Sequence, residues 1–347
     1  MDFRLNEDQQ MYVDTVRRFV KNEILPNILQ IDKSHEFPYG IIAKAWELGI
    51  LNLSVPKEVK GFEIDAVSSA LIIKELSYGD TGISTSAMCN DLANTVIAQH
   101  GSAKQKDDFL GPYAQAPLLA SFCLTEPGAG SDNSSMSTFI AKRADGKYVL
   151  NGAKCFITNA SYASQFTVFC KVGKPTAQLL ACCIVPAEEM FRDGKPNLPA
   201  KPQTELTARG GGKIVLGKPE EKLGQHLSNT ATVTFEDVVV DESQIIGDRR
   251  QGFKYLIDVL DYARPMVAAI GVGLARRALD LTLQYTRERK QFGQRICDMP
   301  VARETLVAMW KKVELAELAL MKAAVKVQER EEDRGMYSSL AKNTAAE

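Results

Sequence analysis

The spacing of apolar residues changes twice along these 347 residues, and this change restricts the folds open to the chain. From Asn6 to about Gly111 apolar residues recur at the three- and four-residue intervals of helices, and the same spacing returns after Gln251. Between Leu118 and Ile246 the apolar runs are short and separated by Gly, Asn, Asp or Pro, which is typical of antiparallel strands. The sequence therefore predicts an α+β fold, with an N-terminal helical domain, a central antiparallel β domain and a C-terminal helical bundle.

We place the three domains at residues 1–117, 118–247 and 248–347. Helices are expected near Asp65–Ser77 and Ser84–His100, and a long surface loop or hairpin over the Pro- and Gly-rich segment Arg192–Pro219. Ser338–Glu347 still reads as helix without a stop signal, so the chain is expected to end inside a helix of a longer protein. The expected strands are Leu119–Leu124, Lys147–Leu150, Cys155–Thr158, Phe166–Cys170, Leu180–Val185 and Thr232–Val240.

Composition excludes several classes of function. Lys and Arg total 42 against 43 Asp and Glu, a balance that argues against binding to nucleic acid or to an anionic membrane surface. Seven cysteines without CxxC spacing and three scattered histidines predict neither a disulfide framework nor a metal site. The sequence lacks a secretory signal and an apolar run of the roughly 18 residues that span a bilayer, so a cytoplasmic protein is expected.

Three common catalytic motifs are absent or incomplete. Gly212–Lys218 has phosphate-loop spacing, but Pro219 stands where Ser or Thr is required. Gly271-Val272-Gly273 lacks the last glycine of a dinucleotide fingerprint, and no GxSxG elbow occurs. Nucleotide hydrolysis, NAD binding and serine hydrolysis therefore lose support.

The segment Leu124–Asp132, with the sequence LTEPGAGSD, follows a predicted strand and is the most specific motif of the chain. Its glycines let backbone N–H groups approach a ligand closely, and Thr125 and Ser131 add hydroxyl donors. A tight hairpin turn would explain a bare GxG, but not the whole string. This string resembles the flavin-binding signature of the acyl-CoA dehydrogenase family. Three further segments resemble that family in the same order, namely Asn151–Asn159, Glu221–Gly224 with Phe235–Val238, and Arg287–Gly293.

The resemblance implies bound FAD, an acyl-CoA thioester substrate and an electron-transfer flavoprotein as electron acceptor. It also implies a homo-oligomer, with the tetramer as the family tendency, because the 287–293 segment would reach the FAD of a neighbouring subunit. Ser131, Asp261, Tyr262 and Arg264 would contact the thioester ligand. The residues implied for FAD are Phe122, Leu124, Thr125, Gly130, Ser131, Phe156, Ile157, Thr158, Arg289, Gln291 and Phe292.

The catalytic base is where this sequence departs from the family. The commonest base is a glutamate in a C-terminal motif that these residues do not reach, and the alternative position holds Ala263. Asp91 lies in the helix that lines the acyl pocket in the family, where apolar neighbours would raise the pKa of a carboxyl. Asp91 is therefore a candidate base, although it could equally face solvent or cap a neighbouring helix.

A base at Asp91 suits a substrate that already carries a double bond beside the thioester. The acidic proton is then on the γ-carbon, and its loss with hydride loss from the other β-carbon of a ring is a 1,4-elimination. At Asp91 the sequence resembles the cyclic acyl-CoA dehydrogenases of anaerobic aromatic degradation, and this resemblance implies cyclohex-1-ene-1-carboxyl-CoA as the substrate. The alternatives are conventional α,β-dehydrogenation of a short- or medium-chain acyl-CoA with a glutamate base beyond residue 347, a catalytically silent acyl-CoA-binding homologue, and an acyl-CoA oxidase.

Overall fold

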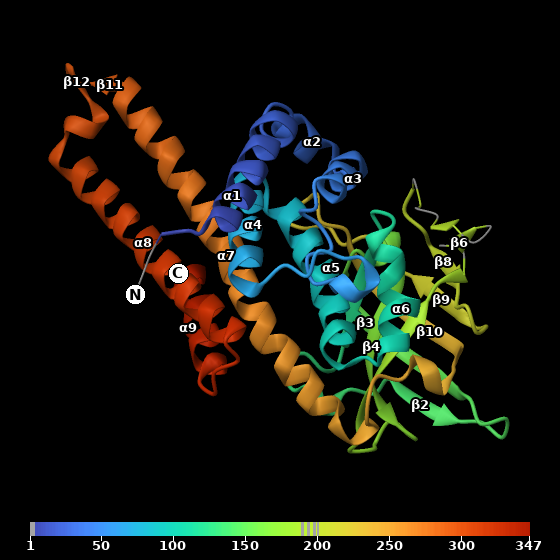
Figure 1. Ribbon diagram of the computed structural model, residues 1–347. Coiled ribbons are helices and arrows are strands. Elements are labelled where there is room, and N and C mark those ends of the chain that lie inside the picture. The colour runs from blue at the N-terminus through green and yellow to red at the C-terminus, as the bar shows by residue number, and fades with distance from the viewer. Residues whose placement is uncertain (1–3, 189–190, 193–194, 197–198, 200) are drawn as a thin grey trace. The chain divides into compact units, whose positions relative to one another are not determined.

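The computed structural model describes residues 4–188, 191–192, 195–196, 199 and 201–347 (Figure 1). The chain divides into two compact units, each built from segments that are separate in sequence. The first, here called the helical unit, comprises Met1–Lys33, Asp65–Thr85 and Leu260–Glu347. The second, here called the sheet unit, comprises Ser34–Ile64 and Ser86–Val259.

Nine α-helices lie in the described part of the chain, and α5 and α7 each run from one unit into the other. The first helix begins with a capping box in which Asn6 and Gln9 bond each other's backbone N–H groups. The helices are α1 (Glu7–Phe19), α2 (Ile28–Ser34), α3 (Tyr39–Glu47), α4 (Ala66–Gly79), α5 (Thr81–His100), α6 (Ala103–Leu110), α7 (Gly252–Glu288), α8 (Pro300–Gln328) and α9 (Arg334–Ala346).

Charged side chains connect α4 to α8 in the helical unit. Lys74 Nζ lies 2.5 Å from Glu317 Oε1, and Arg276 on α7 lies 3.0 Å from Glu314 and from Glu317. Arg17 on α1 donates two hydrogen bonds of 3.0 Å to the Glu75 carboxylate. These pairs occupy the polar side of helices whose apolar residues, such as Leu320 and Leu76, form the core of the unit.

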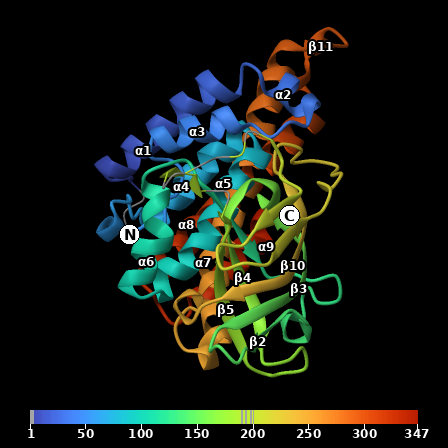
Figure 2. The same cartoon turned by 90° about the vertical axis from the view of Figure 1, so that its right-hand side faces the viewer.

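Eight strands of the sheet unit form one mixed sheet, in the order β1-β4-β2-β3-β10-β9-β8 with β5 paired to β4 (Figure 2). β1 and β2 each run parallel to β4, and the other pairs in this sheet are antiparallel. Its strands are β1 (Leu119–Cys123), β2 (Phe139–Lys142), β3 (Tyr148–Thr158), β4 (Ala163–Val172), β5 (Leu180–Pro186), β8 (Glu205–Thr207), β9 (Lys213–Leu216) and β10 (Thr230–Val240). Two short hairpins add β6 (Phe191–Arg192) with β7 (Lys195–Pro196), and β11 (Lys290–Gln291) with β12 (Gln294–Arg295).

The predicted fold class is confirmed: helices precede and follow a curled β-sheet. Most predicted strands are found, but Lys147–Leu150 and Cys155–Thr158 belong to one continuous strand, β3. Two strands that pair with a third in parallel make the sheet mixed, which turn signals cannot predict because parallel partners are distant in sequence. The excursion Arg192–Pro219 contains the β8–β9 hairpin, and residues 193–194, 197–198 and 200 lie outside the described part.

Helix α7 approaches α4 closely at Gly273, and a substitution at this position tests that packing. A Cβ atom at this position would lie 2.2 Å from the carbonyl oxygen of Lys74 and 2.8 Å from Cβ of Ser77. Because backbone cannot move aside cheaply, Gly273→Ala is expected to lower the free energy of unfolding by about 1–3 kcal/mol. Gly40 on α3 has no atom within 4 Å of such a Cβ, so Gly40→Ala is the control and is expected to be neutral or stabilising. Urea unfolding measures both, and equal effects would contradict the packing argument.

Candidate functional site

Backbone hydrogen bonds close the turn that follows β1 and join this turn to β3. The backbone N–H of Glu126 donates to the Ala129 carbonyl at 3.0 Å, and the Ala129 N–H donates to the Glu126 carbonyl at 3.1 Å. The N–H of Cys155 on β3 donates to the Thr125 carbonyl at 2.9 Å. Gly128 and Gly130 are exposed, and no atom lies within 4 Å of where their Cβ atoms would be. The backbone of the turn is therefore open to a ligand while its ends are fixed.

A buried ion pair between Lys154 and Glu126 fixes the position of this turn. Lys154 Nζ lies 2.9 Å from Glu126 Oε1 and donates to the Leu124 carbonyl at 2.9 Å. The two side chains are 0% and 4% exposed. Glu126 also accepts hydrogen bonds from the Ser137 hydroxyl and the Ser137 and Thr138 N–H groups. Burial alone would raise the pKa of Glu126, but Thr138, Lys154 and Ser137 outweigh it and lower the pKa to about 2.

The end of β3 presents an aromatic side chain to the surface beside unpartnered polar atoms. Phe156 has a φ of 56° and is 67% exposed, which is unusual for an aromatic residue inside a strand. Next to it, the Thr158 carbonyl accepts from the Ser121 hydroxyl at 2.8 Å, and Asn159 Nδ2 donates to the Ser86 carbonyl at 2.9 Å. Ser86 Oγ and Asn159 Oδ1 are buried without a hydrogen-bond partner.

The structure brings the predicted residues of the sheet unit together through β1, the turn and β3. Phe122 packs at a tilt on Phe169 with the ring centroids 5.4 Å apart, and Leu124 and Ile157 are buried. The remaining predicted residues are partly or fully exposed and form an open, partly polar surface. They are Thr125, Gly130, Ser131, Phe156 and Thr158.

The other predicted residues belong to the helical unit. Arg264 Nη1 lies 2.5 Å from Asp261 Oδ1, so these two side chains form an ion pair three residues apart on α7. The Asp261 carbonyl also accepts a hydrogen bond of 2.8 Å from the Ser338 hydroxyl on α9, and Tyr262 is half-buried. These bonds fix the Asp261 end of α7 against α9.

The segment Arg289–Phe292 contains β11 and the start of the turn in the β11–β12 hairpin, which lies between α7 and α8 (Figure 1). Arg289 and Gln291 are exposed, and Phe292 is 94% exposed with a φ of 51°. An aromatic ring held so far into solvent by a tight turn suits a contact outside this chain's own core.

Asp91 on α5 is buried and directed at the preceding loop. Its Oδ1 accepts hydrogen bonds of 2.9 Å from both the N–H and the hydroxyl of Ser54. Burial raises the pKa of Asp91 to about 6, and the Ser54 contacts and the Leu53 N–H reduce that rise. The neighbouring Asn90 bonds the Ala120 N–H on β1 and the side chain of Asn52. Of the roles considered for Asp91, exposure to solvent is thus wrong; the carboxyl is buried and anchors the loop at Ser54, and its role as a base stays a prediction.

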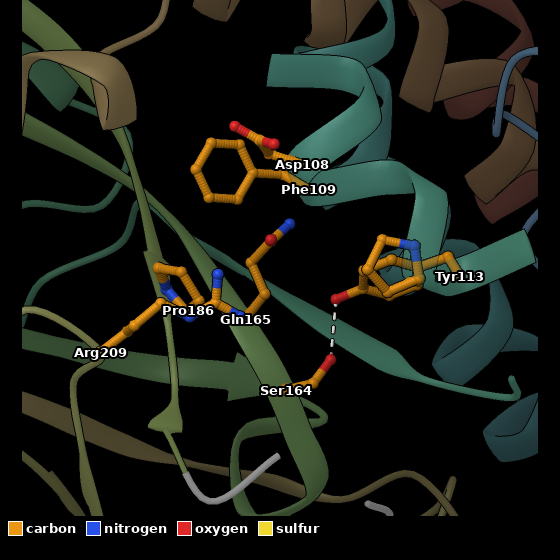
Figure 3. A pocket seen from close by; sticks show the side chains of 8 residues that line it. Asp108, Phe109, Tyr113, Ser164, Gln165, Pro186 and Arg209 are labelled. Atoms are coloured by element: carbon orange, nitrogen blue, oxygen red, sulfur yellow. Dashed lines mark hydrogen bonds between the residues drawn. The ribbon is translucent and has the colours of Figure 1, made fainter. Parts of the chain in front are cut away.

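A narrow crevice lies elsewhere in the sheet unit, between α6, β4 and the 208–210 turn (Figure 3). It adjoins a cleft of about 280 Å³ that shares Asp108, Phe109, Pro186 and Arg209 with it. None of the residues predicted for flavin or thioester lines either hollow, and the Tyr113–Ser164 hydrogen bond of 2.9 Å closes one end of the crevice. We therefore do not assign the site to this crevice. It is lined by Asp108, Phe109, Pro112, Tyr113, Ser164, Gln165, Pro186 and Arg209.

Among the described residues, no group of three or more His, Cys, Asp or Glu side chains is placed to bind a metal ion. The described helices include none that combines the length and the apolarity needed to cross a bilayer.

Sequence reasoning missed the two residues that hold the site in shape. Glu126 and Lys154 both lie within segments that were recognised as flavin motifs, yet the motifs alone assign them no role. The available signal was a lysine in the middle of a strand otherwise rich in apolar residues, because a buried lysine requires a partner.

Comparison with known proteins identifies the family. Three domain models match: the N-terminal domain of acyl-CoA dehydrogenase over residues 6–116, the middle domain over 121–238 and the C-terminal domain over 250–347. The chain is 35% identical over 341 residues to "Probable medium-chain specific acyl-CoA dehydrogenase 2, mitochondrial" of Caenorhabditis briggsae, covering 98% of this chain and 77% of the relative.

Two further similar proteins are also named as dehydrogenases of CoA thioesters. The chain is 31% identical to the "Cyclohex-1-ene-1-carbonyl-CoA dehydrogenase" of Syntrophus aciditrophicus (strain SB), over 99% of this chain and 78% of the relative. The solved structure of butyryl-CoA dehydrogenase from Megasphaera elsdenii is 31% identical with a TM-score of 0.88, over 100% of this chain and 86% of that one.

This chain belongs to the acyl-CoA dehydrogenase family: it is an FAD-dependent oxidoreductase that dehydrogenates acyl-CoA. The site fits the isoalloxazine of FAD. Phe156 offers an exposed aromatic face, and the turn at Gly128–Gly130 offers open backbone. A flat ring system with a polar edge suits both features.

The buried ion pair gives a stability prediction. Glu126→Gln leaves the Lys154 ammonium buried without its counter-charge, and is expected to lower the free energy of unfolding by about 3–5 kcal/mol. Glu126→Gln combined with Lys154→Met removes both charges and is expected to recover most of that loss. The exposed pair Lys213–Glu205 is the control, because Glu205→Gln is expected to cost only about 0–1 kcal/mol. Chemical unfolding measures all three, and a double variant as unstable as the single one would contradict the argument.

The same pair predicts an acid response. The pKa of Glu126 is lowered from 4.5 to about 2 in the folded state, so its stabilising contribution is present above pH 4.5 and is lost as the pH falls toward 2. The Glu126→Gln, Lys154→Met variant lacks this group, and its stability is expected to fall less than that of the wild type across this window. Thermal melts from pH 6 to 2 measure the difference, and parallel curves would refute it.

Proposed function

We propose that this dehydrogenase acts on a cyclic enoyl-CoA such as cyclohex-1-ene-1-carboxyl-CoA, by a 1,4-elimination in which Asp91 takes the proton. The observation that carries the proposal is a carboxyl group that is 5% exposed, oriented through one oxygen by Ser54, and left with its other oxygen unbonded. A relative that is 31% identical is named "Cyclohex-1-ene-1-carbonyl-CoA dehydrogenase".

Several side chains and the glycine turn would bind FAD. Thr125, Ser131 and Thr158 offer the hydroxyl groups, and the Gly128–Gly130 turn the open backbone, that would orient the flavin. Phe156 would cover the ring, and Arg289, Gln291 and Phe292 would reach the cofactor of a neighbouring subunit. Bound FAD supplies the acceptor for the hydride.

Asp91 has the properties of a general base. Its pKa of about 6 lies near neutral pH, where a base is still largely ionised and has appreciable proton affinity. In the proposed reaction its free Oδ2 takes a proton from the γ-carbon, the C–H electrons enter the conjugated system, and a hydride leaves the other β-carbon. The product is a cyclic dienoyl-CoA. Asp261 and Arg264, paired on α7, would hold the polar part of the thioester with Tyr262. Ser131 in the sheet unit is a separate candidate contact for the thioester.

Conventional α,β-dehydrogenation of a short- or medium-chain acyl-CoA is the second candidate. Two observations favour it: the Ser54 bonds would by themselves account for Asp91 as an anchor of the loop, and a 35% identical relative is named "Probable medium-chain specific acyl-CoA dehydrogenase 2, mitochondrial". In this case the base is a glutamate outside the 347 residues. A silent acyl-CoA-binding homologue is the remaining alternative, and a purified flavoprotein that an acyl-CoA never reduces would support it.

Further parts of the proposal come from the family resemblance. We infer a homotetramer, an electron-transfer flavoprotein as acceptor, a cytoplasmic location and a role in anaerobic aromatic degradation. Size-exclusion chromatography with light scattering tests the first, and reduction of the flavoprotein by substrate-loaded enzyme tests the second.

Asp91→Asn tests the base directly. The amide keeps an oxygen for the Ser54 bonds but cannot accept a proton, so the variant is expected to fold and keep FAD. Its turnover of cyclohex-1-ene-1-carboxyl-CoA is expected to fall by about 10²–10⁴-fold. Asp107→Asn, an exposed acid on α6, is the matched control. Undiminished turnover of every accepted thioester by the Asp91 variant, including octanoyl-CoA and butyryl-CoA, would assign Asp91 the anchoring role alone.

A further inference from the structure

Asn159 follows the last residue of β3 and turns the chain sharply. Its φ of 65° and ψ of 3° lie in the left-handed region, which asparagine occupies more readily than most other residues that carry a side chain. Its backbone N–H donates to the Asn229 carbonyl at 2.8 Å, and its carbonyl accepts from the Tyr162 N–H at 2.9 Å. The backbone is therefore fixed immediately after Thr158.

The Asn159 side chain does not cap the 3₁₀ turn Ala160–Tyr162 that it precedes. An asparagine in this position usually accepts a hydrogen bond from the backbone of the following turn. Here the residue is 0% exposed, and Nδ2 donates instead to the Ser86 carbonyl on α5 at 2.9 Å and to the Ala120 carbonyl on β1 at 3.4 Å. The side chain thus joins the end of β3 to two segments that are distant in sequence.

The neighbouring Thr158 is bonded to the same two elements. Its carbonyl accepts a hydrogen bond of 2.8 Å from the Ser121 hydroxyl on β1, and its side chain and the Cys89 thiol on α5 form a hydrogen bond. Ser86 and Cys89 are three residues apart on α5, so they lie on one face of the helix. One face of α5 therefore contacts both Thr158 and Asn159.

Helix α5 is itself fixed to the sheet near these contacts. Asn90 Oδ1 accepts from the Ala120 N–H at 2.7 Å, and the Thr167 hydroxyl on β4 donates to the Ala93 carbonyl at 3.0 Å. A strand end that is bonded to such a support has few conformations left to lose when a ligand binds, and this preorganisation strengthens binding.

We propose that Asn159 is a positioning residue for the flavin site: its bonds to α5 and β1 hold the end of β3 so that the Thr158 hydroxyl is ordered before the cofactor binds. Phe156 is exposed and Thr158 half-exposed, whereas Ile157 between them is buried. Asn159 is buried as well, so it acts through Thr158 and not by touching the cofactor. This inference rests on the flavin role of Thr158 in the proposed function.

Asn159→Gly removes the side-chain bonds and keeps the backbone conformation, because glycine adopts the left-handed region freely. The variant is expected to fold and to bind FAD about tenfold more weakly, as measured by flavin fluorescence titration of the apoprotein. Asn151→Gly is the matched control on the same strand, since its side chain bonds Asp237 and neither α5 nor β1. It is expected to leave the FAD affinity unchanged. An FAD affinity that Asn159→Gly does not alter, or that both variants lower equally, would overturn the proposal.

A Thr158→Val background separates positioning from a general loosening of the fold. If Asn159 acts through the Thr158 hydroxyl, Asn159→Gly weakens FAD binding by less than about twofold once that hydroxyl is absent. An equal loss in both backgrounds would overturn the role of Asn159 and leave the proposed flavin site intact. Thr158→Val alone tests that site: an affinity equal to the wild type would remove Thr158 from it, and the role of Asn159 with it.

The wild-type protein gives a second test that needs no variant. If the bonds of Asn159 order Thr158 in advance, the Thr158 methyl group has nearly the same NMR order parameter in the apoprotein as in the FAD-bound protein. Methyl relaxation measures both. An order parameter that is low in the apoprotein and rises when FAD binds would overturn the proposal, because the cofactor and not Asn159 would then position the side chain.

Discussion

The buried ion pair between Lys154 and Glu126 is the interaction on which the shape of the glycine turn, the proposed flavin site, depends. Both charges are removed from water, which costs several kcal/mol for each ion unless hydrogen bonds replace the lost hydration. Here the Lys154 ammonium also bonds the Leu124 carbonyl, and Glu126 accepts from Ser137 and Thr138. The pair thereby connects the end of β1, the glycine turn and β3, and fixes the backbone that we propose faces the cofactor. A more apolar pair would pack as well, but would not orient the turn through directed bonds.

A second polar network extends the same principle to α5. Asn90 bonds β1 at Ala120 and reaches Asn52, while the next residue, Asp91, bonds Ser54 two positions further along the same loop. Consecutive helix residues thus hold alternate residues of one loop. The arrangement explains why a carboxyl can be buried here without a cation. Hydrogen bonds to Oδ1 keep it ionisable, while burial keeps its pKa close to neutral.

Much of this could be predicted because local signals and family motifs agree. The change of apolar spacing predicted the helices and the sheet, and the LTEPGAGSD string predicted the family. What escaped prediction depends on contacts between distant segments. The parallel pairing of β1 with β4, the partner of Lys154 and the bonds from Ser54 to Asp91 each join residues that no local pattern links. Asp91 shows the limit most clearly, since its sequence position is compatible with a solvent-facing, a capping or a catalytic role.

The affinity of the apoprotein for FAD in a double-mutant cycle tests the central claim most directly. The cycle compares the wild type, Glu126→Gln, Lys154→Met and the double variant by flavin fluorescence titration. If the pair orients the turn, each single change weakens FAD binding, and the double change weakens it by at least about fivefold less than the two effects combined, a coupling of about 1 kcal/mol. Independent effects that simply multiply, or an FAD affinity that none of the variants alters, would contradict the account.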